Sequence, residues 1–354
     1  MKKNVIIIVI VLALLAISLV LLMHNKQGTL RSDIGGFAID DTATVTKIFM
    51  ADRQGNEVLL KEQAPGHWIL NDSLMARREG VELLLSTMAR LAVKAPVSKS
   101  IYNTVIKRLA SSSVKVEIYQ MAPRINIFNW IKLFPHEKLT RVYYVGSATP
   151  DNMGSFMLME DSDTPFVVYL PGFRGYVSAR FTAYVSDWRD HTIFAKKPAQ
   201  IKSIQVEFPG ESFESFRIDK FGDSDLKLQE LINDHIYDGF DTSRVIDFIN
   251  AFRNIRFEES FQNIDFGHKD SILAQRPVNI ITLTDTQGNT QKVSTYRRQN
   301  IDGQKDLEGN FQPWDVDRLY AVNEDSDELL LVQYFVFDPI TRPLSFLLGE
   351  YKGE

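Results

Sequence analysis

The sequence predicts an α+β protein in which an N-terminal transmembrane helix precedes two diverged tandem repeats. Each repeat is expected to be mainly antiparallel β-sheet with one principal amphipathic helix. Two observations lead to this fold class. The first is an uncharged apolar run from Val5 to Met23. The second is a match of the chain to itself at an offset of 164 residues, which aligns a helical stripe, a strand and an acidic turn.

The apolar run has the length of a membrane-spanning helix. Its 19 residues contain one polar side chain, Ser18, and at about 1.5 Å per residue they extend over roughly 28 Å, close to the ~30 Å hydrocarbon core of a bilayer. A cleaved signal peptide is the alternative interpretation. The run is longer than a signal-peptide core. The sequence at its C-terminal end, Leu21-Leu-Met-His-Asn-Lys26, lacks the small residues of a cleavage site. We therefore expect an uncleaved anchor.

The charges around the run predict its orientation. Lys2 and Lys3 precede it, and positive residues favour the cytoplasmic side of a membrane. We expect residues 1–4 to form a cytoplasmic tail and residues 5–23 to anchor the chain in the inner membrane as a single pass. The bulk of the chain would then be extracytoplasmic.

The remaining chain divides into a tether and two repeats. Residues 24–43 contain three glycines and a pair of acids, a composition typical of flexible linkers. The first repeat then covers residues 44–196 and the second covers residues 197–354. Their helical stripes align position by position: Val81, Leu84, Leu85, Met88 and Leu91 with Val245, Phe248, Ile249, Phe252 and Ile255. The other two aligned pairs are 114–119 with 278–283, and the identical Glu160-Asp-Ser-Asp163 and Glu324-Asp-Ser-Asp327.

In the first repeat, short strands are expected from Val45, separated by the turn signals Gly55-Asn56 and Pro65-Gly66. A helix is predicted at 76–92, where apolar residues recur at three and four positions, with Asn71, Asp72 or Ser73 as its cap. A shorter helix is predicted at 100–109. The further strands expected are 114–119, 141–145, 156–159 and 166–170, which are rich in β-branched and aromatic residues.

The second repeat is predicted to follow the same order. Its helix covers 243–256, with Asp241 or Thr242 as the cap. The strands expected after it are 278–284, 291–296, 318–322 and 329–337, and Thr286-Gln-Gly-Asn289 is a hairpin signal between the first two.

Composition and motifs give little support to catalysis. The net charge of −5 argues against nucleic acid as a partner, and the lack of cysteine excludes disulfides and thiolate metal sites. No Gly-x-Ser-x-Gly, His-Glu-x-x-His or phosphate-binding glycine motif occurs. The two acidic tetrapeptides are interpreted either as solvated turns or as an ion site. We therefore expect a non-enzymatic protein without a cofactor.

One segment of the first repeat has no counterpart in the second. Residues 124–141 are aromatic and basic, and several of their apolar side chains would share one face of a helix. Such a segment can lie on an anionic membrane or dock on a partner; a hairpin that folds its aromatic residues onto the core is the alternative. The candidate contact patch consists of Ile127, Trp130, Ile131, Lys132, Phe134 and Lys138.

A second candidate site lies where the repeats meet in the sequence. Asp187-Trp-Arg-Asp190 combines a tryptophan with alternating charges. Trp188 and Arg189 are expected either to fix the joint between the repeats or to line a ligand cleft between them.

The order of these motifs resembles a known family. Val45-Thr-Lys-Ile48 and His67-Trp-Ile-Leu70 precede the helix at 76–92, and Asp187-Trp-Arg-Asp-x-x-Ile-Phe194 precedes Ile201-Lys-Ser-Ile204. This order resembles the bacterial domain-of-unknown-function family 4340. The resemblance implies a single-pass membrane protein of unassigned activity, with some members associated with ABC-type export systems. It supplies no catalytic residue.

These observations lead to a functional expectation with two alternatives. We expect a membrane-anchored, extracytoplasmic, non-enzymatic interaction module whose partners are the lipid bilayer, through residues 5–23, and a membrane transport complex. A ligand-binding protein that holds a glycan or peptide in the cleft between the repeats is the first alternative. A hydrolase of the cell envelope is the second.

Overall fold

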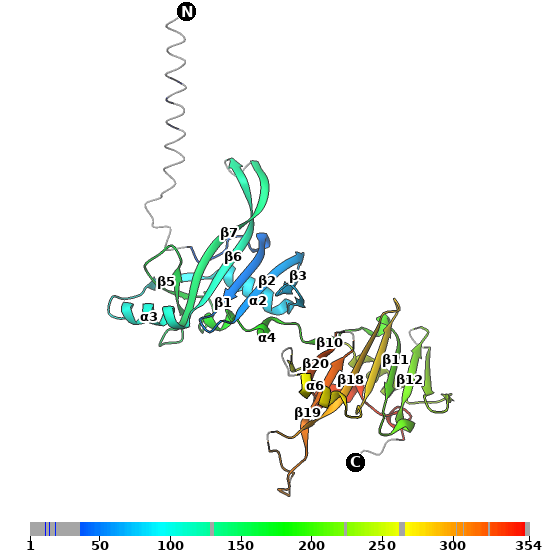
Figure 1. The fold of residues 1–354 in the computed structure, drawn as a ribbon. Helices are drawn as coiled ribbons and strands as arrows, with labels where there is room; N and C mark the ends of the chain where they lie inside the picture. The colour runs from blue at the N-terminus through cyan, green and yellow to red at the C-terminus, as the bar shows by residue number, and fades with distance from the viewer. Residues whose placement is uncertain are drawn as a thin grey trace, which may run out of the picture. The chain divides into compact units, whose positions relative to one another are not determined.

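The computed structural model describes residues 36–127, 131–222, 225–261, 266–301, 303–306, 308–324 and 326–350, together with Val11, Leu14 and Ser18. The chain divides into two compact units, Met1–Asp190 and His191–Glu354 (Figure 1). Within the described residues, each unit contains one nine-stranded antiparallel sheet.

The first unit has the strand order β4-β3-β2-β1-β6-β7-β8-β9-β5. Its strands are β1 Val45–Ala51, β2 Glu57–Ala64, β3 His67–Leu70, β4 Leu74–Met75, β5 Ala92–Pro96, β6 Val114–Ile127, β7 Ile131–Ala148, β8 Ser155–Met159 and β9 Phe166–Tyr169. Its helices are α2 Arg78–Arg90, α3 Tyr102–Ser112 and α4 Val185–Trp188, with 3₁₀ turns at Thr42–Thr44 and Ser178–Arg180.

The second unit has the strand order β14-β13-β12-β11-β17-β18-β19-β20-β16, and β10 pairs separately with β15. Its strands are β10 Thr192–Phe194, β11 Ile201–Glu207, β12 Phe216–Lys220, β13 Leu226–Glu230, β14 Ile236–Tyr237, β15 Ile255–Arg256, β16 Glu259–Ser260, β17 Ile280–Asp285, β18 Thr290–Gln299, β19 Trp314–Asn323 and β20 Glu328–Gln333. Its helices are α5 Thr242–Ala251, α6 Phe266–Leu273, α7 Tyr334–Phe337 and α8 Leu344–Leu347, with 3₁₀ turns at Pro198–Gln200, Ser212–Glu214 and Asp338–Ile340.

The two sheets share one topology. Each strand of the first sheet has a counterpart at the same place in the second, with β1 matching β11, β6 matching β17 and β7 matching β18. The helices correspond as well, since α2 and α5 lie between equivalent strands, as do α3 and α6. A common strand order over nine strands is strong structural support for an internal duplication.

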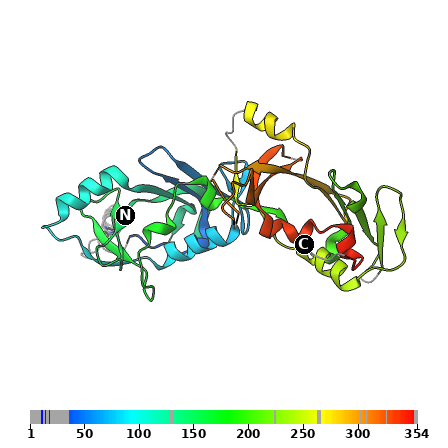
Figure 2. The ribbon, with the colours of Figure 1, turned by 90° about the horizontal axis from the view of Figure 1, so that it is seen from below.

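Each sheet is covered by helices on both faces. In the second unit, Phe248 of α5 belongs to the main core, whereas Ile272 of α6 packs with Tyr296 and Tyr320 in a separate cluster. Figure 2 shows α6, drawn in yellow, on the opposite side of the sheet from α5 and the C-terminal helices. In the first unit, Leu84 of α2 lies in the main core and Leu109 of α3 lies in the smaller cluster. Burial of both sheet faces explains why many strand positions are apolar on both sides.

The sequence alignment of the β6 and β17 strands is wrong by one residue. Ile118 is buried and pairs with Ile48 of β1, and Leu283 is buried and pairs with Ile204 of β11. These equivalent positions are 165 residues apart, whereas the offset of 164 places Ile118 on Thr282, which is only partly buried. Because strand side chains alternate between faces, a slip of one residue exchanges the core and opposite faces.

The predicted N-terminal cap is confirmed for one of the two main helices and wrong for the other. Asp241 caps α5 as predicted, since its Oδ1 accepts the Arg244 amide at 3.1 Å. The predicted cap of α2 is wrong, because α2 starts after Arg77 without a side-chain cap. Asn71 and Asp72 instead form the turn between β3 and β4, with φ angles of 49° and 59°. Both residue types tolerate this left-handed conformation.

One turn chemistry recurs three times in the chain. Asp52–Asn56, Asp285–Asn289 and Asp306–Asn310 all have the sequence Asp-x-x-Gly-Asn. In each, the aspartate accepts the amide hydrogens of two residues within the turn. The glycines have φ angles of 91°, 89° and 87°, which only glycine adopts readily.

The predicted fold class is contradicted in its transmembrane helix. In the part of the chain that the structure describes, none of the helices has both the length and the apolar character needed to span a bilayer. The predicted anchor at residues 5–23 lies outside the described residues, except for its three single positions. The fold class is corrected to two β-rich units, each with an antiparallel sheet and helices on both of its faces.

Candidate functional site

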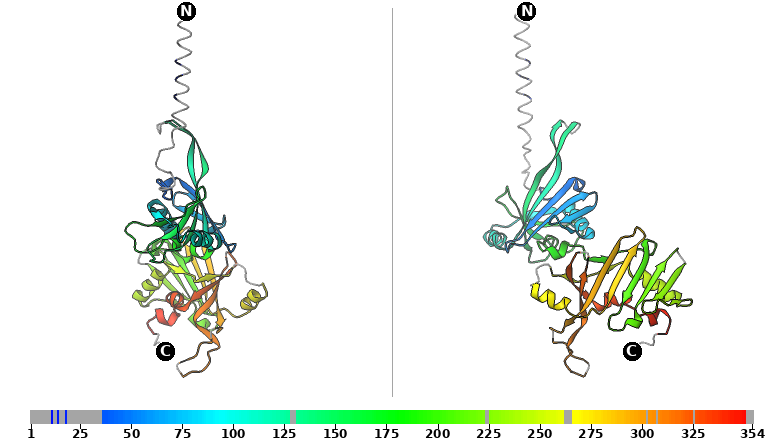
Figure 3. Two further views of the ribbon diagram at one scale, coloured as in Figure 1. Left: turned by 90° about the vertical axis from the view of Figure 1, so that its left-hand side faces the viewer. Right: turned by 45° about the vertical axis from the view of Figure 1, so that its right-hand side comes forward.

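The β6–β7 hairpin extends beyond the first sheet as a two-stranded ribbon. β6 and β7 pair from Val114↔Val145 to Ile127↔Ile131. The neighbouring strands stop earlier, because β1 pairs with β6 only as far as Gln120 and β8 begins to pair with β7 at Tyr143. Figures 1 and 3 show this hairpin projecting from the sheet. We call residues 121–127 and 131–139 the distal ribbon.

The predicted helical contact patch is corrected to this ribbon. Antiparallel pairing gives the segment a period of two residues, so side chains three and four apart do not share a face. Trp130 lies outside the described residues, and so do the side chains of Ile127, Ile131 and Lys132. Phe134 and Lys138 are described, and both side chains are exposed.

One face of the distal ribbon is apolar. Residues that are directly opposite in an antiparallel pair share a face, and the register places Ile125 opposite Leu133 and Pro123 opposite Pro135. Met121 and Leu139 lie on the same face at the ribbon's root, together with Glu137, which is opposite Met121 and paired with Lys47. The exposed fractions of the four larger side chains are between 41% and 44%. In the described structure, this face is an uncovered, mainly apolar stripe with one carboxylate, Glu137, at its root.

The opposite face is polar and basic. It carries Lys138 opposite Gln120 and His136 opposite Ala122, and Arg124 follows by alternation. Phe134 interrupts the alternation, because its φ of 57° bends the strand, and its side chain is 65% exposed. The ribbon therefore combines an apolar face, a cationic face and one projecting aromatic ring.

Both free edges of the ribbon are interrupted by proline. Pro123 and Pro135 face each other, and neither has an amide hydrogen to donate. Proline at an exposed edge hinders the addition of another strand. Recognition by this ribbon is therefore expected to use its side chains. The sequence contains a signal for this ribbon, because two prolines within a strand-like segment indicate edge positions.

Polar contacts fix the root of the ribbon to β1. Glu137 accepts hydrogen bonds from Lys47 Nζ at 2.5 Å and from Thr46 Oγ1 at 2.8 Å. The hydrogen bond from Lys47 holds the pKa of the Glu137 carboxyl below its ordinary value. The same ammonium lies 3.9 Å from the centroid of the Tyr119 ring. These contacts support the direction in which the ribbon projects.

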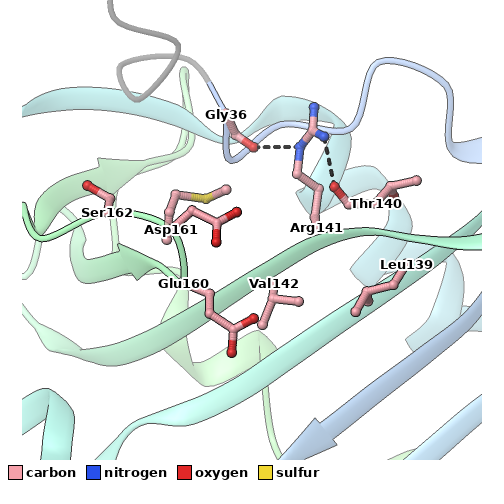
Figure 4. Close-up of a pocket in the computed structure, with 9 residues that line it drawn as sticks. Gly36, Leu139, Thr140, Arg141, Val142, Glu160, Asp161 and Ser162 are labelled. Atoms are coloured by element: carbon pink, nitrogen blue, oxygen red, sulfur yellow. Dashed lines mark hydrogen bonds between the residues drawn. The ribbon is translucent and has the colours of Figure 1, made fainter.

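A pocket of about 400 Å³ lies beside this root, and Figure 4 shows the residues that line it. Arg141 donates from Nε to the Gly36 carbonyl at 2.9 Å and from Nη1 to the Thr140 carbonyl at 3.0 Å. Glu160 and Asp161 of the acidic turn form another part of the wall. The pocket is thus lined by both the segment 124–141 and the acidic turn that starts at Glu160. Its positive and negative side chains suit a polar ligand group.

The acidic turns have a structural role in both units. Ser162 donates its amide to the Met159 carbonyl at 3.1 Å, and Ser326 makes the equivalent bond to Asn323 at 3.2 Å. The carbonyl of Asp163 accepts a hydrogen bond from Tyr102 of α3, and that of Asp327 accepts one from Lys269 of α6, each at 2.6 Å.

Each acidic turn therefore closes a hairpin and holds the second helix of its unit. Among the described side chains, no group of three His, Asp or Glu residues is placed to hold a metal ion.

Comparison with known proteins identifies the family. Residues 68–265 match the family model described as "Domain of unknown function (DUF4340)", which is more than half of the chain. The chain belongs to this family. The resemblance inferred from the sequence is thereby confirmed, while the link to ABC-type export stays a prediction. No curated protein and no solved structure matches the chain.

In this DUF4340 protein, Trp188 belongs to the core of the first unit. Its side chain is 4% exposed, and Nε1 donates to the Thr182 carbonyl at 2.8 Å. Its own carbonyl accepts the Arg77 amide at 2.6 Å, and Arg189 forms a β-bridge with Ala76. These contacts attach α4 to the start of α2. The prediction that Trp188 and Arg189 fix a joint or line a cleft between the repeats stays a prediction.

Proposed function

We propose that this DUF4340 protein is a non-enzymatic, extracytoplasmic interaction module that uses the distal ribbon to dock on a protein of a membrane transport complex. The observation that carries the proposal is the uncovered apolar face formed by Met121, Ile125, Leu133 and Leu139. The class of partner is the one that the family resemblance implies.

The chemistry of the ribbon supports docking. Protein interfaces typically have an apolar centre with a polar rim, and arginine and aromatic residues are enriched in them. The ribbon offers an apolar stripe, the Phe134 ring and the basic residues Arg124 and Lys138. Because Glu137 and Lys47 fix its root, less conformational freedom is lost on binding than for a flexible loop.

Site-specific photocrosslinking in native membranes tests the proposal. A photoreactive residue at Leu133 should capture one membrane protein that is not captured from Phe221, an exposed control position of the second unit. The double variant Leu133→Ser and Phe134→Ser should abolish capture from Met121, while the thermal midpoint stays within about 2 °C, since both side chains are exposed.

If the double variant lost folded stability while its association with the membrane or the partner stayed unchanged, the proposal would be refuted, because the ribbon side chains would then be part of the core. Equal capture from Leu133 and Phe221 would also refute it. The ligand-binding and hydrolase alternatives stay predictions.

A further inference from the structure

The second unit contains a cavity of about 600 Å³ that the docking proposal does not use. It lies where the turn after β11, the segment before β17 and the adjoining parts of β18 and β19 come together. Six residues give the cavity its chemical character: Phe208, Arg276, Val278, Asn279, Arg297 and Trp314. Its volume lies within the range of about 300–1,000 Å³ that is usual for small-molecule sites.

Two arginines give this cavity a positive charge. In the described part of the chain, no carboxylate lies within salt-bridge distance of Arg276 or Arg297. The next residue, Arg298, differs, because it is ion-paired with the buried Asp315. Adjacent strand residues point to opposite faces, so β18 directs one guanidinium toward a buried acid and the other toward the cavity. Among the described residues that line the cavity, Glu211 supplies the single carboxylate.

The rest of the lining combines a flat ring with amide groups. The Arg297 guanidinium lies 5.7 Å from the centroid of the Trp314 ring, and the ring is 37% exposed. Asn279 is buried, and its backbone amide is occupied because it donates to Thr295 Oγ1 at 3.1 Å. The Val278 amide is also occupied, since it donates to the Thr295 carbonyl at 2.8 Å. Phosphate sites commonly use free backbone amides, so this segment is poorly suited to phosphate.

We propose that this cavity binds an acidic sugar, with a carboxylate held by Arg276 and Arg297. Guanidinium groups match the planar geometry of carboxylates. The Trp314 indole and the apolar Phe208 and Val278 offer surface to the C–H groups of a sugar ring. The amide side chains of Gln275 and Asn279 can exchange hydrogen bonds with its hydroxyl groups.

Calorimetric titration of the full chain tests this site, with a tetrasaccharide of galacturonic acid as the probe and a tetrasaccharide of galactose as the neutral control. Arg297→Gln should weaken binding of the acidic probe at least tenfold. Arg253→Gln should leave it unchanged, because this exposed arginine lies outside the cavity. The neutral probe should not bind measurably.

Three outcomes would overturn the proposal. The first is equal affinity for both tetrasaccharides, and the second is unchanged affinity in Arg297→Gln and in Arg276→Gln. The third is displacement of the acidic probe by inorganic phosphate at equal concentration, which would indicate a general anion site. Because both guanidinium groups are exposed, an unchanged thermal midpoint in the variants will show that they are folded. None of these outcomes depends on whether the ribbon docks.

Discussion

Replacement of Tyr143 by phenylalanine is expected to stabilise the first unit. The Tyr143 side chain is fully buried in the core, where its ring centroid lies 5.9 Å from that of Phe37 and 6.1 Å from that of Phe181. In the described structure, its hydroxyl has no hydrogen-bond partner. Burial also raises the pKa of this hydroxyl, so the group stays neutral throughout the physiological range.

The magnitude follows from two opposing contributions. A buried polar group without a partner costs about 1–3 kcal/mol, and Tyr143→Phe removes that cost while it keeps both ring contacts. The space left by one oxygen is ~10 Å³, which costs about 0.2 kcal/mol at ~24 cal/mol per Å³. We expect a net gain of about 1 kcal/mol in the free energy of unfolding. For a unit of this size the thermal midpoint should rise by about 2–4 °C.

The measurement is urea and thermal unfolding of the full chain, with Tyr144→Phe as the matched control. Tyr144 is the next residue and is partly exposed, and its hydroxyl donates to Glu160 at 3.3 Å. The control should change stability by less than about 0.5 kcal/mol. If Tyr143→Phe destabilised the first unit by more than about 0.5 kcal/mol, the reasoning would be refuted, because the hydroxyl would then be hydrogen-bonded in solution.

Three further substitutions test the energetics of the fold. Asp315→Ala leaves Arg298 without its buried counter-charge, and urea unfolding should show a loss of about 3–5 kcal/mol; a loss below about 1 kcal/mol would contradict this. Trp188→Ala removes a side chain that is 4% exposed and should cost about 3–5 kcal/mol, whereas a purely superficial role predicts little change. The hydrogen bond from Lys196 lowers the pKa of Asp285. The stability that the aspartate contributes is therefore complete above its ordinary pKa and lost as pH falls below about 4. The difference in unfolding midpoint between wild type and Asp285→Asn should shrink in acid, and a constant difference from pH 7 to pH 2 would refute the coupling.

The main helices were predictable because their buried stripes are long. Val81, Leu84 and Met88 are buried in α2, and their aligned partners are also buried, Val245 and Phe248 in α5 and Phe252 at its C-cap. Three or four positions at helical spacing determine a face even when the ends are misplaced by a few residues. Among the described side chains of β6, only Val116 and Ile118 are fully buried apolar positions. Two positions do not exclude a slip by one residue, so the strand alignment was wrong while the helix alignment was right.

The distal ribbon was misinterpreted because two periods compete within it. The apolar residues from 127 to 134 recur at three and four positions, as in a helix. The residues before them, Met121, Pro123 and Ile125, alternate at two positions and carry the strand signal. The pairing of Pro123 with Pro135 was not predictable from local sequence, since it depends on the register of the whole hairpin.

The cavity of the second unit was not predictable either. Arg276 and Arg297 are 21 positions apart in the sequence, and Trp314 follows 17 positions later. No motif connects them. They come together because β18 and β19 pair across a long connection, with Gln299 opposite Trp314. Sites assembled by strand pairing between distant segments carry no local spacing pattern.

The shared topology of the two units permits a direct separation of scaffold from docking element. Ile118 and Leu283 are equivalent strand positions. Ile118 pairs with Arg141 on the next strand, and Leu283 pairs with Gln291. The connection between the paired residues has 22 residues in the first unit. In the second unit it has seven, which are the Asp-x-x-Gly-Asn turn and one residue on each side. Replacement of residues 119–140 by residues 284–290 should therefore close the hairpin with a turn that the same topology already accommodates.

We expect this graft to keep the first unit folded. It removes the Glu137 ion pair with Lys47, an exposed contact worth about 0.2–1 kcal/mol, and it also shortens the loop between the paired strands, which reduces the entropy lost on closure. Docking of the graft is measured by photocrosslinking from Met75, which is exposed on β4. Near-wild-type unfolding of the full chain, together with loss of this crosslink to the membrane partner, would assign docking to the ribbon alone. An unfolded first unit would show that the ribbon is part of the scaffold, and a retained crosslink would place the docking surface elsewhere on the unit.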